Sequence, residues 1–228
     1  RSTRIFELIN DHKSIDYNKF KKIKYDNSFP NPFNYSFMDV NNLFKMNPND
    51  YPYIKQLLIE IQKWDRKTNI ESVGAGTYSM FYYNLVKFYR KSYINKKFGE
   101  DVIAQVLQET KQQMLKYFKT TKVKLGDVWQ LGKHRIMWGM PDVIIAMNAS
   151  NYKDDKVKVT HGESYIQFAK FSEKGTEIES VISYGSSDHI NSEHYNDQME
   201  MYAKFQTKKM SFDKNEVYKN AKKIYHPK

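Results

Sequence analysis

The chain has 228 residues, a mass of 27.2 kDa, a formal net charge of +11 at pH 7 and no cysteine. Hydrophobic residues make up 40% of the chain and aromatic residues 15%, which is enough apolar material for a packed core and excludes a wholly disordered protein. The lack of cysteine excludes disulfides and thiol chemistry.

The positive charge raises the question of an anionic partner. A basic protein attracts nucleic acid, but here the lysines are spread along the chain among 26 acidic residues. Even the densest cluster, Lys19, Lys21, Lys22 and Lys24, alternates with apolar residues, which is typical of a solvated helix face. No apolar run reaches the length of a membrane span, and the first residues lack a secretory leader pattern. We therefore expect no nucleic-acid and no membrane partner.

The first 120 residues have helical periodicity. We expect helices over residues 3–10, 16–25, 53–64, 78–89 and 101–118, the second of them capped by Ser14 or Asp16. The segment 53–64 is the clearest, because its apolar residues share one face: Ile54, Leu57, Leu58, Ile61 and Trp64. Glycines at 74 and 76 predict a turn before the aromatic fourth helix.

The periodicity changes in the second half. Short runs rich in β-branched and aromatic residues predict strands at 143–147, 157–159, 164–171 and 177–184. Two helices, 194–205 and 213–225, are expected to close the chain. Helices followed by strands indicate an α+β fold, with a helical part at 1–120 and a β-rich part at 121–228 that together form one domain.

Several kinds of site are not supported by the spacing of the residues. The six histidines are scattered, and His189 and His194, although flanked by acidic residues, fit a surface turn better than a metal site. The two glycines at 74 and 76 lack the Lys-Ser/Thr pair and the third glycine of a phosphate-binding loop. No Gly-x-Ser-x-Gly nucleophile elbow occurs. We therefore predict no metal or cofactor site.

The most informative motif lies near the end of the chain. Gly185, Ser186 and Ser187 form a small-residue turn, followed by the sequence Ser-Glu-His-Tyr-Asn-Asp-Gln at 192–198 and by Tyr202. This motif resembles the closing segment of the large β chain of the penicillin amidase family. Further segments resemble landmarks of the same chain in the same order: 64–75, 125–128, 139–143 and 161–165. The resemblance extends from about residue 3 to the C-terminus. We expect the landmark 64–75 to be architectural and the C-terminal motif to be structural. In that motif Tyr195, Met199 or Tyr202 would face the sheet core, and Asp197 and Gln198 would bond to the Gly185–Ser187 turn.

The resemblance implies an N-terminal-nucleophile αββα sandwich, of which this chain is the C-terminal part. Enzymes of this family hydrolyse N-acylated amides such as penicillins or N-acyl-homoserine lactones, and the N-terminal serine that attacks is expected upstream of this chain. The implied partners are the small α chain and the N-terminal part of the β chain, cut from the same precursor. No cofactor is consumed; some members hold a structural Ca²⁺, whose ligands we do not find here. The implied location is periplasmic or secreted.

Arg4 is the one site residue that the resemblance indicates. The segment beginning at Arg4 is similar to the family segment just after the oxyanion-hole asparagine, where an arginine lies beside the catalytic centre. Arg4 would orient that asparagine or bind polar substrate groups. The alternative is an ordinary surface pair with Glu7 at i,i+3. Ser2 is not expected to be the nucleophile, because Arg1 precedes it and Thr3 and Arg4 replace the family's following residues.

A second function class stays open from the sequence. The chain could be a non-catalytic α+β binding module with a basic surface, without any hydrolase partner. An upstream Ser-Asn-x-Trp motif would favour the enzyme, whereas salt-dependent DNA retention would favour the module.

Overall fold

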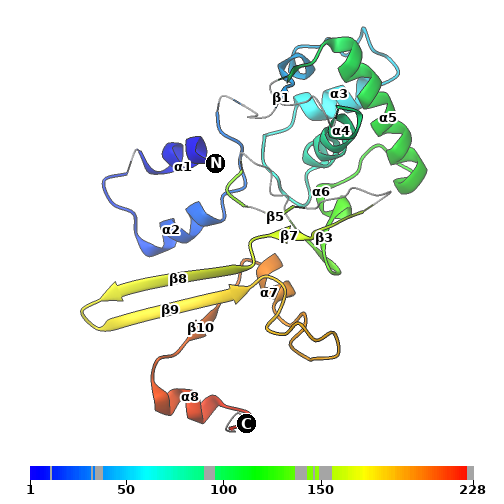
Figure 1. Cartoon of the computed structure of the whole chain (residues 1–228). Helices are drawn as coiled ribbons and strands as arrows, with labels where there is room; N and C mark the ends of the chain where they lie inside the picture. Colours follow the sequence, from blue (N-terminus) through cyan, green and yellow to red (C-terminus); the bar gives the residue numbers. More distant parts are fainter. Residues whose placement is uncertain are drawn as a thin grey trace. The chain divides into compact units, whose positions relative to one another are not determined.

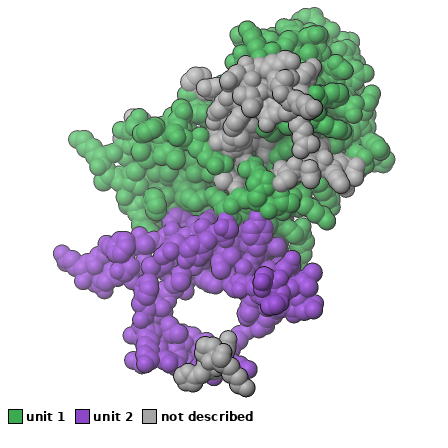
Figure 2. All heavy atoms as spheres, viewed as in Figure 1, with its two compact units in different colours: residues 1–163 green, residues 164–228 purple. Residues whose placement is uncertain are grey.

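The computed structural model describes residues 1–10, 12–31, 33, 38–89, 96–136, 143–145, 147–148 and 156–224. The chain divides into two compact units, residues 1–163 and 164–228 (Figure 2). Helices and strands occur together, as Figure 1 shows, which confirms the α+β class. No helix among the described residues is long and apolar enough to span a bilayer.

The first unit begins with two short helices, α1 (Ser2–Ile9) and α2 (Tyr17–Lys24). Asp16 caps α2, because its side chain accepts a hydrogen bond from the backbone N–H of Lys19 at 2.8 Å. Of the two predicted caps, Asp16 is therefore the one that the structure uses.

The core of this unit is helical. It contains the 3₁₀ helix η1 (Asn41–Phe44) and the helices α3 (Lys55–Gln62), α4 (Val73–Tyr89) and α5 (Glu100–Phe118), with α4 packed against α3 and α5. All five apolar residues predicted for the face of the 53–64 segment are buried. On α5, Ile103, Val106, Leu107 and Met114 are buried, while Phe118 remains partly exposed.

The predicted glycine turn before α4 is wrong, since Gly74 and Gly76 form the first turn of the helix itself. Their role is close packing. A Cβ on Gly74 would lie 2.5 Å from Cβ of Trp64, and one on Gly76 would lie 2.2 Å from the carbonyl oxygen of Val123. The backbone could not approach these neighbours with any larger residue, so packing overrides the weak helix propensity of glycine.

Short strands complete the first unit. β1 (Met38–Asp39) pairs in parallel with β2 (Lys96–Lys97). After α6 (Leu125–Val128), β3 (Trp129–Leu131) lies between β4 (His134–Arg135) and β6 (Val157–Lys158). β5 (Met147–Asn148) pairs with β7 (His161–Gly162). Of the strand predicted at 143–147, residues 143–145 are bends, 146 lies outside the described residues, and only Met147 is in a strand.

The second unit is built on a long hairpin. β8 (Tyr165–Ser172) and β9 (Gly175–Ile182) pair antiparallel along their whole length, and β10 (Lys208–Met210) adds to the other side of β9. Two short helices, α7 (Met199–Ala203) and α8 (Lys214–Asn220), flank β10 in the sequence (Figure 1). Both long strands lie within two residues of their predicted bounds.

The first C-terminal helix is shorter than the sequence predicts. Residues 194–198 form turns, and α7 begins only at Met199. The carbonyl of His194 accepts hydrogen bonds from the backbone N–H groups of Ser186 and Ser187 at 2.8 and 3.1 Å. That carbonyl is therefore bound to the preceding turn rather than to a helical N–H four residues on. The second helix, expected to reach 225, ends at Asn220, and residue 225 lies outside the described part of the chain.

Candidate functional site

Arg4 lies on α1 and is held by two carboxylates. Its Nε and Nη2 atoms donate to the two carboxylate oxygens of Asp26 at 2.8 and 2.9 Å, which is a bidentate fork. Its Nη1 atom donates to Glu7 at 2.9 Å, the i,i+3 contact expected on a helix surface. The Glu7 pair foreseen as the alternative thus forms, and a second partner is added to it.

The two carboxylates also organise the chain around them. Asp26 follows α2 and accepts a hydrogen bond from the backbone N–H of Ser28 at 3.1 Å. Glu7 accepts one from the backbone N–H of Asn31 at 2.9 Å. Arg4 therefore connects α1 with the segment that follows α2.

The cluster is partly buried but remains open to solvent. The side chains of Arg4 and Asp26 are 19% and 16% exposed, in contrast to a freely solvated surface pair. The hydrogen bonds that Arg4 donates to Asp26 are the main cause that raises the pKa of Arg4 above its ordinary value, although partial burial opposes it. Arg4 is a permanent cation that can hold an oxygen atom in place but cannot accept a proton.

Asp26 is the residue that sequence reasoning missed. It lies 22 positions from Arg4, so neither helical spacing nor a local motif links the two. The nearest signal was its place just after the predicted second helix, where no role was assigned.

Ser2 is the first residue of α1 and is exposed. The residue before it, Arg1, donates from Nε to the carbonyl of Val143 at 2.8 Å. The nitrogen of Ser2 is part of the peptide bond to Arg1 and has no basic lone pair, so it cannot activate the hydroxyl.

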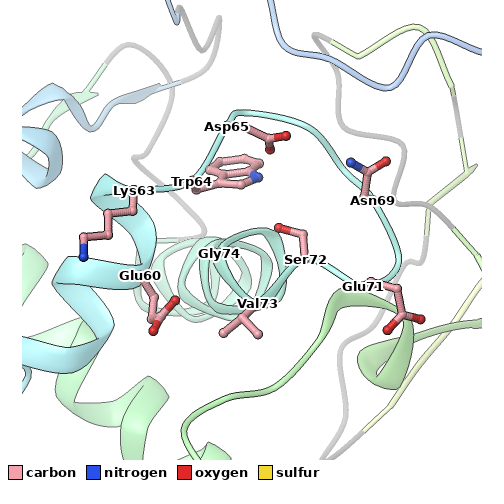
Figure 3. Close-up of a pocket in the computed structure, with 9 residues that line it drawn as sticks. All are labelled: Glu60, Lys63, Trp64, Asp65, Asn69, Glu71, Ser72, Val73 and Gly74. Atoms are coloured by element: carbon pink, nitrogen blue, oxygen red, sulfur yellow. The ribbon is translucent and has the colours of Figure 1, made fainter.

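An open depression of about 370 Å³ lies where α3 ends and α4 begins (Figure 3). Its lining is Glu60, Lys63, Trp64, Asp65, Asn69, Glu71, Ser72, Val73 and Gly74. Ser72 caps α4, since its hydroxyl accepts a hydrogen bond from the N–H of Ala75 at 3.1 Å. Asp65 instead accepts one from the N–H of Lys67 at 3.0 Å and shapes the turn between the helices. The side chains of Ser72 and Asp65 thus both accept hydrogen bonds from backbone N–H groups and stabilise the local backbone conformation.

Two of the sequence landmarks, 64–75 and 125–128, contact each other beside this depression. The N–H of Leu125 donates to the carbonyl of Ser72 at 3.0 Å, and the N–H of Gly126 donates to that of Ile70 at 2.8 Å. Glu71 adds contacts with Lys124 at 2.7 Å and Arg135 at 2.6 Å. The hydrogen bond from Lys124, followed by that from Arg135, lowers the pKa of Glu71 below its ordinary value. The segments 64–75 and 125–128 are thus one structural joint rather than two sites.

The C-terminal motif, which we call the C-terminal lock, fastens the start of α7 to the Gly185–Ser187 turn through hydrogen bonds. The side chain of Gln198, only 2% exposed, donates to the hydroxyl of Ser186 at 2.6 Å and accepts from the N–H of Ile182 at 2.9 Å. Gly185 is required there, because a Cβ would lie 2.4 Å from the carbonyl oxygen of His194. Tyr202 is 3% exposed. These contacts agree with the predicted structural role of the motif.

One part of that prediction is wrong. Asp197 was expected to bond to the Gly185–Ser187 turn, but its carboxylate faces Nδ1 of His194 at 3.0 Å. The His194 side chain is 52% exposed, and its Nε2 lies 3.4 Å from Glu193. Within the described residues there is no group of three or more His, Cys, Asp or Glu side chains placed to hold a metal ion.

Of the remaining landmarks, residues 139–142 lie outside the described residues. The segment 161–165 begins with β7, and its Glu163 forms an ion pair with Lys24 of α2.

Comparisons with known proteins agree with these landmarks. A family model described as penicillin amidase matches residues 1–219. Among solved structures, a thermostable penicillin G acylase from Alcaligenes faecalis matches with a TM-score of 0.40 and 13% sequence identity. The match covers 99% of this chain and 53% of the acylase chain, so this chain spans about half the length of that protein. A search of curated proteins found no match. Since the family model covers nearly the whole chain, the protein belongs to the penicillin amidase family.

Proposed function

We propose that the chain is part of an amide hydrolase that cleaves N-acylated substrates. The observation that carries this proposal is the penicillin amidase match over residues 1–219. In the proposed reaction a serine hydroxyl adds to the amide carbonyl, the C–N bond breaks, and the amine leaves with a proton. Water then cleaves the acyl-serine ester to a carboxylic acid and restores the serine.

The nucleophile in this proposal lies outside these 228 residues. It is an N-terminal serine whose own α-amine acts as the base through a water molecule, a role that Ser2 cannot fill behind Arg1. The partner that supplies it is the rest of the same precursor, namely the small α chain and the N-terminal part of the β chain. We expect the complete enzyme to form an αββα sandwich.

Arg4 is the proposed contribution of this chain to catalysis. Asp26 and Glu7 engage three of the five N–H donors of its guanidinium and fix its plane. A guanidinium held in this way can orient the asparagine that binds the oxyanion, and it needs no reorganisation during the reaction. In this proposal Asp26 and Glu7 are positioning residues, and Arg4 acts on the oxyanion site.

The proposed substrates have an apolar acyl group on the amide, as in penicillins or N-acyl-homoserine lactones, and the proposed location is periplasmic or secreted. Hydrolysis of phenylacetyl and long-chain acyl p-nitroanilides by the complete protein tests this function. We expect p-nitroaniline release and a mass increase of one acyl group on an N-terminal serine. A processed, folded enzyme that cleaves none of these amides and does not react with a serine-directed acylating reagent would contradict the proposal.

The binding module remains the second candidate, favoured by the charge of +11. Its test is retention of the 228-residue chain on duplex DNA over a salt series, because binding to phosphates weakens steeply with salt. Retention that disappears with rising salt, together with a complete protein that lacks hydrolase activity, would favour the module.

A further inference from the structure

The C-terminal basic segment, residues 204–224, concentrates the charge of the chain. It contains seven lysines, no arginine and two acidic residues, so its formal charge is +5 of the total +11. Nearly half of the net charge is therefore carried by about a tenth of the sequence.

Both acidic residues of this segment are used in local contacts. Asp213 caps α8 by accepting a hydrogen bond from the N–H of Glu216 at 2.9 Å. The Glu216 carboxylate accepts a hydrogen bond from the hydroxyl of Ser211 and lies 3.5 Å from Nζ of Lys209. Lys209 pairs with Glu216 inside the segment, and Lys204 pairs with Glu200 just before it. The segment still has five more lysines than acidic residues, so its formal charge stays at +5.

The same segment exposes large apolar side chains. Phe212, Ile224, Val217 and Tyr218 are 71%, 62%, 51% and 50% exposed. On α8, Lys214, Val217 and Tyr218 occupy positions i, i+3 and i+4, which share one helix face, and Nζ of Lys214 lies 5.7 Å from the ring centroid of Tyr218. Cationic and apolar groups are thus mixed on one surface.

This composition distinguishes between partners. Protein interfaces are depleted in lysine and enriched in arginine, and the fork of arginine is also preferred for reading nucleic acid. Lysine and exposed aromatic rings together fit a lipid surface, where the rings and the lysine stems enter the headgroup layer and the ammonium groups stay at the phosphates. We propose that residues 204–224 bind the surface of an anionic phospholipid bilayer. The sequence expectation of no membrane partner considered only spanning segments, and surface binding needs none.

The test is sedimentation of the complete protein, with the rest of its precursor present, with vesicles of phosphatidylcholine alone and of phosphatidylcholine with one third phosphatidylglycerol. We expect binding to the anionic vesicles only, and its loss at high ionic strength. Replacing Lys208, Lys214 and Lys219 by glutamine should lower the partition coefficient roughly a hundredfold, since each lysine near such a surface contributes about 1 kcal/mol. The double variant Phe212→Ser and Tyr218→Ser should lower it about tenfold.

The matched control replaces Lys19, Lys21 and Lys22 of α2 by glutamine, which removes the same charge elsewhere, and it should retain binding. An equal loss in this control, or equal binding to neutral vesicles, would overturn the proposal. So would tighter binding to duplex DNA than to anionic vesicles at the same salt. Should the lysine variant lose its circular dichroism, Phe212→Trp provides an independent test. Bromine-labelled acyl chains should quench this tryptophan, and no change in quenching relative to the parent chain would also refute the proposal.

Discussion

Arg4 connects the structure with the proposed chemistry. Its side chain is 19% exposed, and removing it leaves the carboxylates of Asp26 and Glu7 without their cation. In the complete enzyme we expect Arg4→Ala to lower kcat/KM by roughly 2–4 kcal/mol of transition-state stabilisation. If the contacts of Arg4 with its carboxylates are only structural, the same substitution should change the activation free energy derived from kcat/KM by less than about 1 kcal/mol. Steady-state kinetics well below the melting temperature distinguish the two, and kinetics like those of the parent enzyme would remove Arg4 from the site.

Asp26→Asn tests how much the ion pair between Arg4 and Asp26 contributes to stability. Asparagine keeps the shape but replaces one acceptor oxygen by an N–H₂ that faces the donor Nη2 of Arg4. We expect a loss of about 1–2 kcal/mol in the free energy of unfolding, measured by urea denaturation of the 228-residue chain. Glu7→Gln is the matched control and should cost about 0.5 kcal/mol, because its pair is local and more exposed. A larger loss for Glu7→Gln would reverse the assigned order of the two carboxylates.

At the scale of single residues, the sequence predicted contacts between residues that are close together in the chain. Asp16 was one of two predicted caps, and its partner, the N–H of Lys19, lies only three residues away. The contact between Arg4 and Asp26 was not predicted, since the fold alone brings together residues 22 positions apart. For Asp197, the sequence could not distinguish a bond to the turn from the contact with His194 that forms.

At the scale of elements, the close contact of Gly76 with residue 123 reverses an ordinary rule. Alanine in place of glycine within a helix usually stabilises it by about 1 kcal/mol. Here the new Cβ would lie 2.2 Å from the backbone oxygen of Val123, which cannot move as a side-chain tip can. We expect Gly76→Ala to lower the free energy of unfolding by about 2 kcal/mol or more. Gly99→Ala is the control, because its nearest neighbour is the movable side chain of Asp101, and an equal loss there would contradict this explanation.

The C-terminal lock offers two tyrosines of contrasting burial. Tyr202 is 3% exposed, whereas Tyr195 is 38% exposed. Tyr202→Ala should cost roughly 3 kcal/mol or more, because truncation leaves a cavity. Tyr195→Ala should cost less than about 1 kcal/mol. Thermal and urea unfolding of both variants measure the difference, and similar losses would show that Tyr202 does not anchor α7.

Helices of clear amphipathic pattern were predicted well, and the misread elements share one cause. The face of α3 is set by its own apolar spacing, and the structure buries all five predicted residues. The helical conformation at Gly76 depends on its close packing against Val123. The turns at 194–198 depend on the N–H groups of Ser186 and Ser187, which bind the carbonyl of His194. Local propensity predicts the wrong structure where a contact outside the segment determines the backbone conformation.

At the scale of the whole molecule, the chain combines a structural framework with a single candidate site residue. The landmarks at 64–75 and 125–128 join each other, and the C-terminal motif locks its own turn. The sequence predicted an architectural role for the landmark 64–75 and a structural role for the C-terminal motif, and the contacts of both agree with these roles.

The 228-residue chain by itself should therefore have no amidase activity. Formation of an acyl-enzyme needs a serine with a free α-amine, and Ser2 lies behind Arg1 at the start of α1. Without that nucleophile, Arg4 could at most position an oxygen atom, since a guanidinium provides no bond-forming group. Release of p-nitroaniline from phenylacetyl and long-chain acyl p-nitroanilides should stay at the enzyme-free background, with circular dichroism as the check on folding. Turnover by the purified chain would contradict this prediction, and the Ser2→Ala variant would then show whether Ser2 is the group that attacks.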